Sequence, residues 1–170
     1  KVHRNFRMNG TNYSEGDEVA WYSVYPFFLL HMLAFGGSGF FMAYAAKRPD
    51  TLFLYAHGGF AILIYTIFYI TIFGLDEVKW MFINAGLGLL GIYTQMGWLL
   101  SLFGKRIGDY PLSSHVIPFL YYTLYTFLIR HALLDLTQAH EDEDKKQKVE
   151  YSYIAVSLAV SLASYYLGPR

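Results

Sequence analysis

Long runs without charged residues alternate along the chain with short polar connections. Four of these runs are Val24–Ala46, Thr51–Leu75, Trp80–Gly104 and Tyr110–Ile129, and a shorter fifth run covers Tyr151–Gly168. About 20 predominantly apolar residues allow a helix to cross the hydrocarbon core of a bilayer. The pattern therefore predicts an all-α fold, a polytopic integral membrane helical bundle with about five transmembrane helices and short connections.

A soluble helical bundle is the alternative interpretation of the same pattern. A helix on the surface of a soluble bundle keeps a polar face at helical spacing, whereas Val24–Ala46 and Thr51–Leu75 have no charged residue on any face. Charged residues make up only 15% of the chain, against about 25% in a typical soluble domain. Both observations favour the membrane bundle.

The polar stretches divide the chain into four parts. Residues 1–20 form a polar segment, 21–135 a four-span bundle, 136–150 a charged arm, and 151–170 the fifth span with the C-terminus. In the arm, acids precede bases, which is typical of an exposed helix with i,i+4 pairs such as Asp144 with Lys148. Because the chain begins with Lys1, we expect a processed or partial form. Asn9-Gly10-Thr11 and Asn12-Tyr13-Ser14 match the N-glycosylation pattern.

Two stretches of the bundle share a spacing that suggests an internal repeat. Lys47-Arg48 and Lys105-Arg106 each close a Gly-rich run and stand at the same distance before a histidine, His57 or His115. A two-span unit repeated over residues 24–75 and 80–135 explains this spacing, as does chance in ordinary loop sequences. The sequence leaves both explanations open.

Four histidines are the candidate cofactor ligands, because no acidic or basic residue interrupts the first three runs. His31 and His131 are expected towards the side of the N-terminus, and His57 and His115 towards the other side. Neutral imidazoles are axial haem ligands, so haem b or a quinone is the cofactor that these positions suggest. His115 and His131 would point about 160° apart on one helix, which argues against both serving one haem. The sequence predicts no metal site and contains no cysteine.

The end of the fourth run combines charge with a histidine. Arg130, His131 and Asp135 are expected to form the solvated boundary of this helix, with Asp135 orienting His131 as the alternative. Pro118 is expected to kink the same helix and to open a gap beside His115, where a ligand pocket would lie.

The third run carries a stripe predicted to serve helix packing. Asn84, Gly88, Gly91 and Gln95 follow at i, i+4, i+7 and i+11, so they share one helix face. Glycines allow close approach of a neighbouring backbone, and amides can form hydrogen bonds across such a contact. We expect this face to contact protein.

Function is constrained mainly by what the chain lacks. The 13 basic and 13 acidic residues cancel, so no net positive charge favours binding of nucleic acid. No catalytic motif is recognisable, which favours a protein that is not an enzyme but does not decide whether it is one. The leading hypothesis is a non-catalytic accessory or structural subunit of a multi-subunit membrane complex, with the bilayer and other membrane subunits as partners. A mitochondrial or similar inner membrane engaged in electron transport is the candidate location. The alternatives are a haem-, quinone- or lipid-binding redox subunit using the histidines, and a small-solute transporter or channel.

Overall fold

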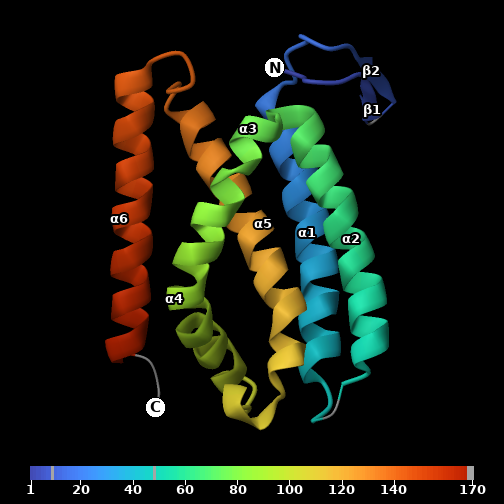
Figure 1. The fold of residues 1–170 in the computed structure, drawn as a ribbon, viewed down its shortest axis with the longest axis vertical. Coiled ribbons are helices and arrows are strands. Elements are labelled where there is room, and N and C mark those ends of the chain that lie inside the picture. Colours follow the sequence, from blue (N-terminus) through green and yellow to red (C-terminus); the bar gives the residue numbers. More distant parts are fainter. Residues whose placement is uncertain (9, 48, 168–170) are drawn as a thin grey trace.

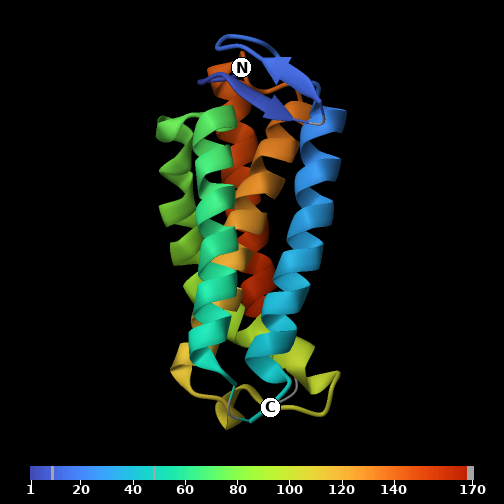
Figure 2. The same cartoon turned by 90° about the vertical axis from the view of Figure 1, so that its right-hand side faces the viewer.

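Five long helices lie side by side and form an elongated bundle in the computed structural model, which describes residues 1–8, 10–47 and 49–167 (Figures 1 and 2). They are α1 (Trp21–Tyr44), α2 (Thr51–Phe73), α4 (Trp80–Ser101), α5 (Leu112–Leu136) and α6 (Glu143–Leu167). Shorter elements are β1 (Phe6–Met8), β2 (Thr11–Tyr13), α3 (Leu75–Val78) and the 3-10 turn η1 (Ile107–Asp109). Asn9 of the predicted glycosylation site, Arg48 of the predicted repeat and Gly168 lie outside the described residues.

Three helices in the described part of the chain are long and apolar enough to cross a membrane. They are Tyr22–Tyr44, Thr51–Phe73 and Leu112–Leu136. Local signals define their ends: the Asp50 carboxylate accepts a hydrogen bond of 3.0 Å from the backbone N–H of Phe53 at the start of α2, and Gly74 ends α2 at φ +90°. The helical bundle and its membrane character are thus confirmed in this coarser form.

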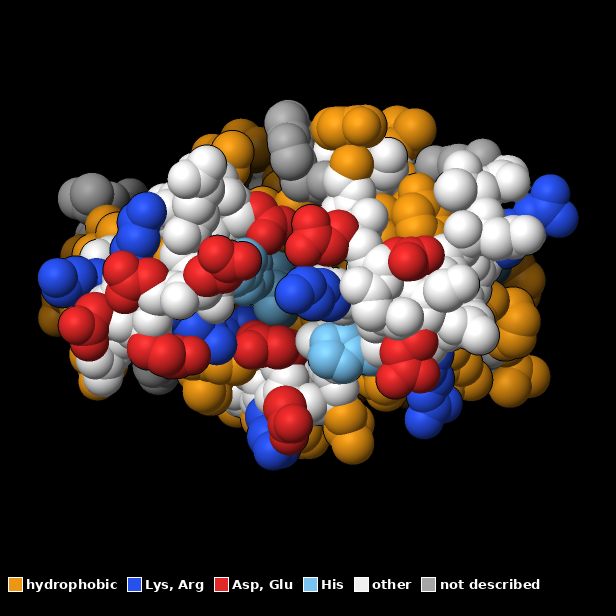
Figure 3. All heavy atoms as spheres, turned by 90° about the horizontal axis from the view of Figure 1, so that it is seen from above, with side chains coloured by type: hydrophobic (Ala, Val, Ile, Leu, Met, Phe, Trp, Pro, Cys, Tyr) orange, Lys and Arg blue, Asp and Glu red, His pale blue; other side chains and the backbone are white. Residues whose placement is uncertain are grey.

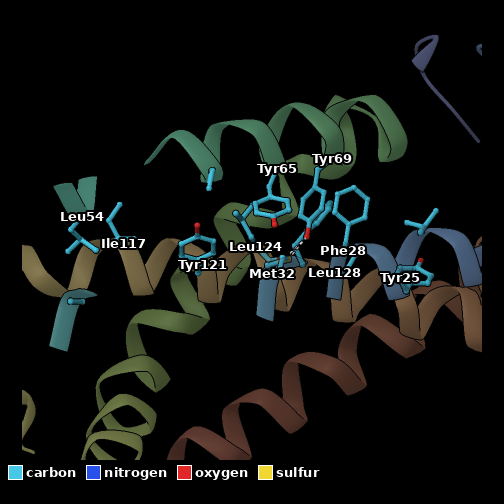
Figure 4. Close-up of a cluster of buried hydrophobic side chains, with 14 of the residues drawn as sticks. Tyr25, Phe28, Met32, Leu54, Tyr65, Tyr69, Ile117, Tyr121, Leu124 and Leu128 are labelled. Atoms are coloured by element: carbon cyan, nitrogen blue, oxygen red, sulfur yellow. Dashed lines mark hydrogen bonds between the residues drawn. The ribbon is translucent and has the colours of Figure 1, made fainter. Parts of the chain in front are cut away.

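The hydrophobic core lies where α1, α2 and α5 meet (Figure 4). Phe28, Tyr69 and Leu124, one from each helix, are all fully buried. The Tyr69 hydroxyl donates a hydrogen bond of 3.2 Å to the Leu124 carbonyl, which satisfies its polar atom within the apolar core. At Gly58, an added Cβ would lie 2.5 Å from a methyl carbon of Ile117, so this glycine brings α2 close to α5.

The second half of the charged arm and the fifth run form one helix. α5 continues beyond Ile129 to Leu136, and α6 begins at Glu143, so the second half of the predicted arm is the first two turns of α6. α5 also remains helical through Pro118. The arm is therefore part of the bundle.

A two-stranded hairpin at the N-terminus is absent from the sequence-based prediction. β1 and β2 pair antiparallel, with Phe6 opposite Tyr13 and their rings stacked 5.2 Å apart. The His3 backbone N–H donates to the Thr71 carbonyl at 2.9 Å, which attaches this segment to the end of α2. The hairpin lies at the same end of the bundle as α3 (Figure 1).

Candidate functional site

Charged side chains gather at the end of the bundle where α3, the end of α5 and the start of α6 meet, and Figure 3 shows this face. Arg130 of α5 is at the centre, and its side chain is 0% exposed. Arg130 donates through Nη1 to Glu77 of α3 at 2.7 Å and through Nη2 to Glu150 of α6. Lys146 of α6 lies 3.3 Å from the other oxygen of Glu77. We call Arg130, Glu77, Glu150, Lys146 and His131 the Arg130 cluster.

The charges within the cluster balance. Two cations, Arg130 and Lys146, face two carboxylates, and the Arg130 guanidinium also lies 4.0 Å from the centre of the Trp80 ring. A buried cation is tolerated only when it is paired and hydrogen-bonded in this way. Arg130 Nε is nevertheless a buried polar atom without a hydrogen-bond partner in the described structure. The cluster is therefore a closed ionic connection between three helices.

Local structure brings the two carboxylates to Arg130. The turn at Gly74 redirects the chain into α3, which carries Glu77 back over the end of α5. Lys146 and Glu150 are one turn apart in α6 and share a face. Burial raises the pKa of Glu77, but the hydrogen bond and the charge of Arg130 outweigh it, and the net pKa lies below the usual range. Glu77 is therefore held as a carboxylate.

His131 occupies an aromatic environment beside the cluster. Its ring stacks on Phe73 with centroids 4.2 Å apart and contacts Phe127 at 4.6 Å. Nε2 lies 3.3 Å from Nη1 of Arg130 and 3.6 Å from Glu77, while Nδ1 is buried without a hydrogen-bond partner among the described residues. His131 thus contributes an aromatic surface and one ring nitrogen that can accept a hydrogen bond from Arg130.

The predicted solvated boundary is wrong for Arg130 and His131, which are 0% and 2% exposed. The physical reason is that α3 and α6 cover the end of α5 and supply the counter-charges. Asp135 accepts a hydrogen bond from the Tyr25 hydroxyl and lies 2.6 Å from Nε2 of His140. Asp135 therefore orients His140, a residue that the sequence did not single out.

The remaining predicted histidines lie in separate environments. His31 Nδ1 is 2.7 Å from the carbonyl of Phe27 one turn earlier. His57 lies against aromatic rings, and His115 Nδ1 is 2.7 Å from the Tyr44 hydroxyl. Across the described residues, no recorded contact joins any two of the four predicted histidines, and no group of three His, Cys, Asp or Glu side chains is arranged to hold a metal ion.

The Asn84 stripe lies against α5 and α6. Asn84 is 1% exposed and accepts a hydrogen bond of 3.2 Å from Tyr153 of α6. An added Cβ at Gly88 would lie 3.1 Å from the Tyr122 ring of α5, and one at Gly91 would lie 2.5 Å from Ser161 Oγ of α6. The fourth residue, Gln95, lines a groove between α5 and α6.

This groove is a concave feature that the sequence did not indicate. It has a volume of about 640 Å³, and its lining is mostly apolar, with Lys145 and Lys148 at one end and Val160 towards the other. The groove is not the pocket expected beside His115 and Pro118, since neither residue lines it. A signal was present in α6, where the lining residues recur at intervals of three and four.

Comparisons with protein-family models, with curated proteins and with solved structures found no match. Function is therefore inferred from the geometry of this chain. Its contacts define a membrane-type helical bundle with an ionic cluster at one end and an amphipathic groove on its side.

Proposed function

We propose that this chain is a non-catalytic subunit of a larger membrane assembly, and that all five long helices cross the membrane. The helices contain 22 to 25 residues, or about 33–38 Å at 1.5 Å per residue, which matches a hydrocarbon core of about 30 Å with short interfacial ends. An energy-converting organellar membrane is the proposed location. The assembly partners would lie within the bilayer.

The outer face of α4 carries this proposal. Gly88 and Gly91 bring α4 close to its neighbours on the inner face, while Gly86 and Gly97 lie on the opposite face with nothing within 4 Å of an added Cβ. Because they are eleven residues apart, Gly86 and Gly97 project from the same side of the helix. Small residues at such positions let a second transmembrane helix approach closely. This face of α4 fits a helix of another subunit.

Tyr93 lies between these two glycines and supports the same proposal, that a helix of another subunit packs on this face of α4. Its side chain is 61% exposed near the middle of α4, and the described residues offer its hydroxyl no recorded partner. A hydroxyl at this depth finds no hydrogen-bond partner in hydrocarbon. A neighbouring helix would supply one.

The chemistry of the Arg130 cluster supports a non-catalytic role. Its cations and carboxylates neutralise one another, and Arg130 is covered on all sides. A catalytic side chain must be accessible to the substrate or to the proton that it transfers. The cluster is suited to holding helices in place.

Four glycines with open space around an added Cβ provide a matched test. Gly86→Leu and Gly97→Leu alter the proposed interface, while Gly37→Leu in α1 and Gly59→Leu in α2 are controls with equally open surroundings. Each change also replaces glycine by a better helix former, so none should weaken the isolated bundle. Assembly mass would be measured after mild-detergent extraction from native membranes.

The two α4 variants should release the chain from a larger assembly, and the two controls should leave the assembly intact. Photo-crosslinking through benzoylphenylalanine incorporated at position 93 should join the otherwise unchanged chain to one species of defined mass. A monomeric wild-type protein, or four variants with the same mass profile, would contradict the proposal. Conversion or transport of a substrate by the purified chain alone would also contradict it.

A further inference from the structure

Two lysines without acidic partners stand at one end of the groove between α5 and α6. Lys145 and Lys148 are three residues apart in the first turns of α6, so they lie on one side of the helix. Lys146, between them in sequence, faces the opposite way and pairs with Glu77. Within residues 1–8, 10–47 and 49–167, no ion pair is recorded for Lys145 or Lys148, and none of the groove lining is acidic. The groove therefore begins with two uncompensated positive charges.

The nearby acids at the start of α6 lie outside the groove, and the i,i+4 pair of Asp144 with Lys148 suggested by the sequence is not among the ion pairs recorded for the described residues. Asp142 is engaged at the helix end, where its carboxylate accepts a hydrogen bond of 3.1 Å from the backbone N–H of Lys145. Residues 141–144 are all exposed and do not line the groove. The positive end faces the same side as the charged surface of the bundle, where lipid headgroups would lie.

Beyond the lysines, the groove is a long apolar channel. Val149, Val156 and Val160 line it from α6, and Ile129 and Leu133 line it from α5. The twelve helical steps from Lys148 to Val160 span about 18 Å, a little over half of a hydrocarbon core of about 30 Å. The volume, about 640 Å³, falls within the range of roughly 300–1,000 Å³ that is typical of small-molecule sites. These dimensions suit an acyl chain from one leaflet.

Contacts at both ends hold the groove open. Glu150 binds Arg130 at the charged end, and Ser161 lies against Gly91 of α4 further along. Between these two points, side chains such as Val156 and Ser152 face α5, and they are too short to fill the space. The groove is therefore built into the way α6 is attached.

We propose that this groove binds one anionic glycerophospholipid, with its phosphate at Lys145 and Lys148 and one acyl chain between α5 and α6. Cationic side chains at the interface attract anionic headgroups, and an apolar channel of this length accepts the chain of the same molecule. The site rests on the proposed crossing of the membrane by α6, but it does not depend on the subunit role, because it lies on a different face from Gly86 and Gly97.

The test is lipid binding to the detergent-solubilised full chain, followed by native mass spectrometry with phosphatidylglycerol and phosphatidylcholine of equal chain length. Lys145→Gln/Lys148→Gln should weaken phosphatidylglycerol binding by roughly fivefold for each lysine removed. Arg4→Gln/Arg7→Gln is the charge-matched control, because both residues are exposed in the N-terminal segment and no ion pair is recorded for either among the described residues. This control should leave binding unchanged.

A second variant tests the acyl-chain part of the site. Val156→Trp places a large ring in the middle of the groove, at a position whose native side chain is 62% exposed and lies outside the core. It should reduce phosphatidylglycerol binding with both lysines intact, and circular dichroism would verify the fold.

Four results would overturn the proposal. Equal loss of lipid in the control double variant would show general surface attraction. Equal binding of phosphatidylcholine and phosphatidylglycerol would remove the role of the lysines. No effect of Val156→Trp, or no retained phosphatidylglycerol in the wild type, would mean that the groove is empty of lipid or holds a helix of a partner.

Discussion

Removing Glu150 should destabilise the bundle strongly, because it leaves a buried guanidinium with one carboxylate fewer. In Glu150→Ala, Arg130 Nη2 loses its acceptor while the side chain stays 0% exposed. Loss of one partner of a buried ion pair typically costs about 3–5 kcal/mol. We expect about 3 kcal/mol, the lower end of that range, since Glu77 still pairs with Arg130 and Glu150 is itself 14% exposed.

A double-mutant cycle separates this electrostatic cause from loss of packing. Arg130→Met removes the cation that makes the loss of Glu150 costly, so Glu150→Ala should cost less in that background. We expect a coupling free energy of about 1–3 kcal/mol. Glu141→Ala, at an exposed position outside the helices, should change the free energy of unfolding by no more than about 0.5 kcal/mol.

The assay is equilibrium unfolding in mixed micelles of a mild detergent and dodecyl sulfate, followed by tryptophan fluorescence. Trp80 lies against Arg130, so its emission also reports on the cluster. If Glu150→Ala costs no more than Glu141→Ala, or if the cycle shows no coupling, Arg130 does not depend on Glu150 and the described role of the cluster is wrong.

Three further predictions concern separate parts of the bundle. The pKa of Glu77 is lowered in the folded state, so the stabilisation by its carboxylate is fully present above the ordinary pKa of 4.5 and is lost as pH falls through the folded value. Thermal unfolding between pH 7 and 3 should therefore show the melting temperatures of wild type and Glu77→Gln converging as pH falls. A constant difference between them would refute this. Gly58→Ala should destabilise by about 1–3 kcal/mol through its clash with Ile117, whereas Gly59→Ala, which meets open space, should stabilise slightly through helix propensity; equal unfolding midpoints would contradict it. His131→Phe should change stability by no more than about 1.5 kcal/mol. The ring is stacked on phenylalanines, Nδ1 has no recorded partner, and Arg130 Nη1, which lies 3.3 Å from Nε2, keeps its hydrogen bond to Glu77. A loss above about 3 kcal/mol would show that the imidazole nitrogens matter.

The helices were predictable where the chain avoids charge altogether. Uncharged runs locate α1 and α2 to within a few residues, because a helix in lipid must be apolar on every side. The end of α5 was less predictable, since Arg130 resembles a solvated helix end when only its sequence neighbours are considered. Its partners Glu77 and Glu150 lie 53 and 20 residues away, and only the folded chain brings them together.

The hairpin and the groove differ in how far the sequence indicates them. Asn-Gly between two short alternating segments favours a two-residue hairpin, so Asn9-Gly10 is a sequence signal for β1 and β2. The signal is weak beside the long uncharged runs that predict the helices. The groove depends on the separation of α5 and α6, which no local pattern encodes. Lys145 and Lys148 look like part of a solvated charge run until α6 is seen beside α5.

The position of Arg130 in the chain also bears on biosynthesis. Its first carboxylate partner, Glu77, is synthesised before it, and its second, Glu150, is synthesised after it. A nascent chain that has inserted α5 therefore holds an arginine whose Nη2 has no carboxylate acceptor until α6 arrives. Chains interrupted before residue 143 should accordingly be degraded faster in pulse-chase experiments than full-length chains.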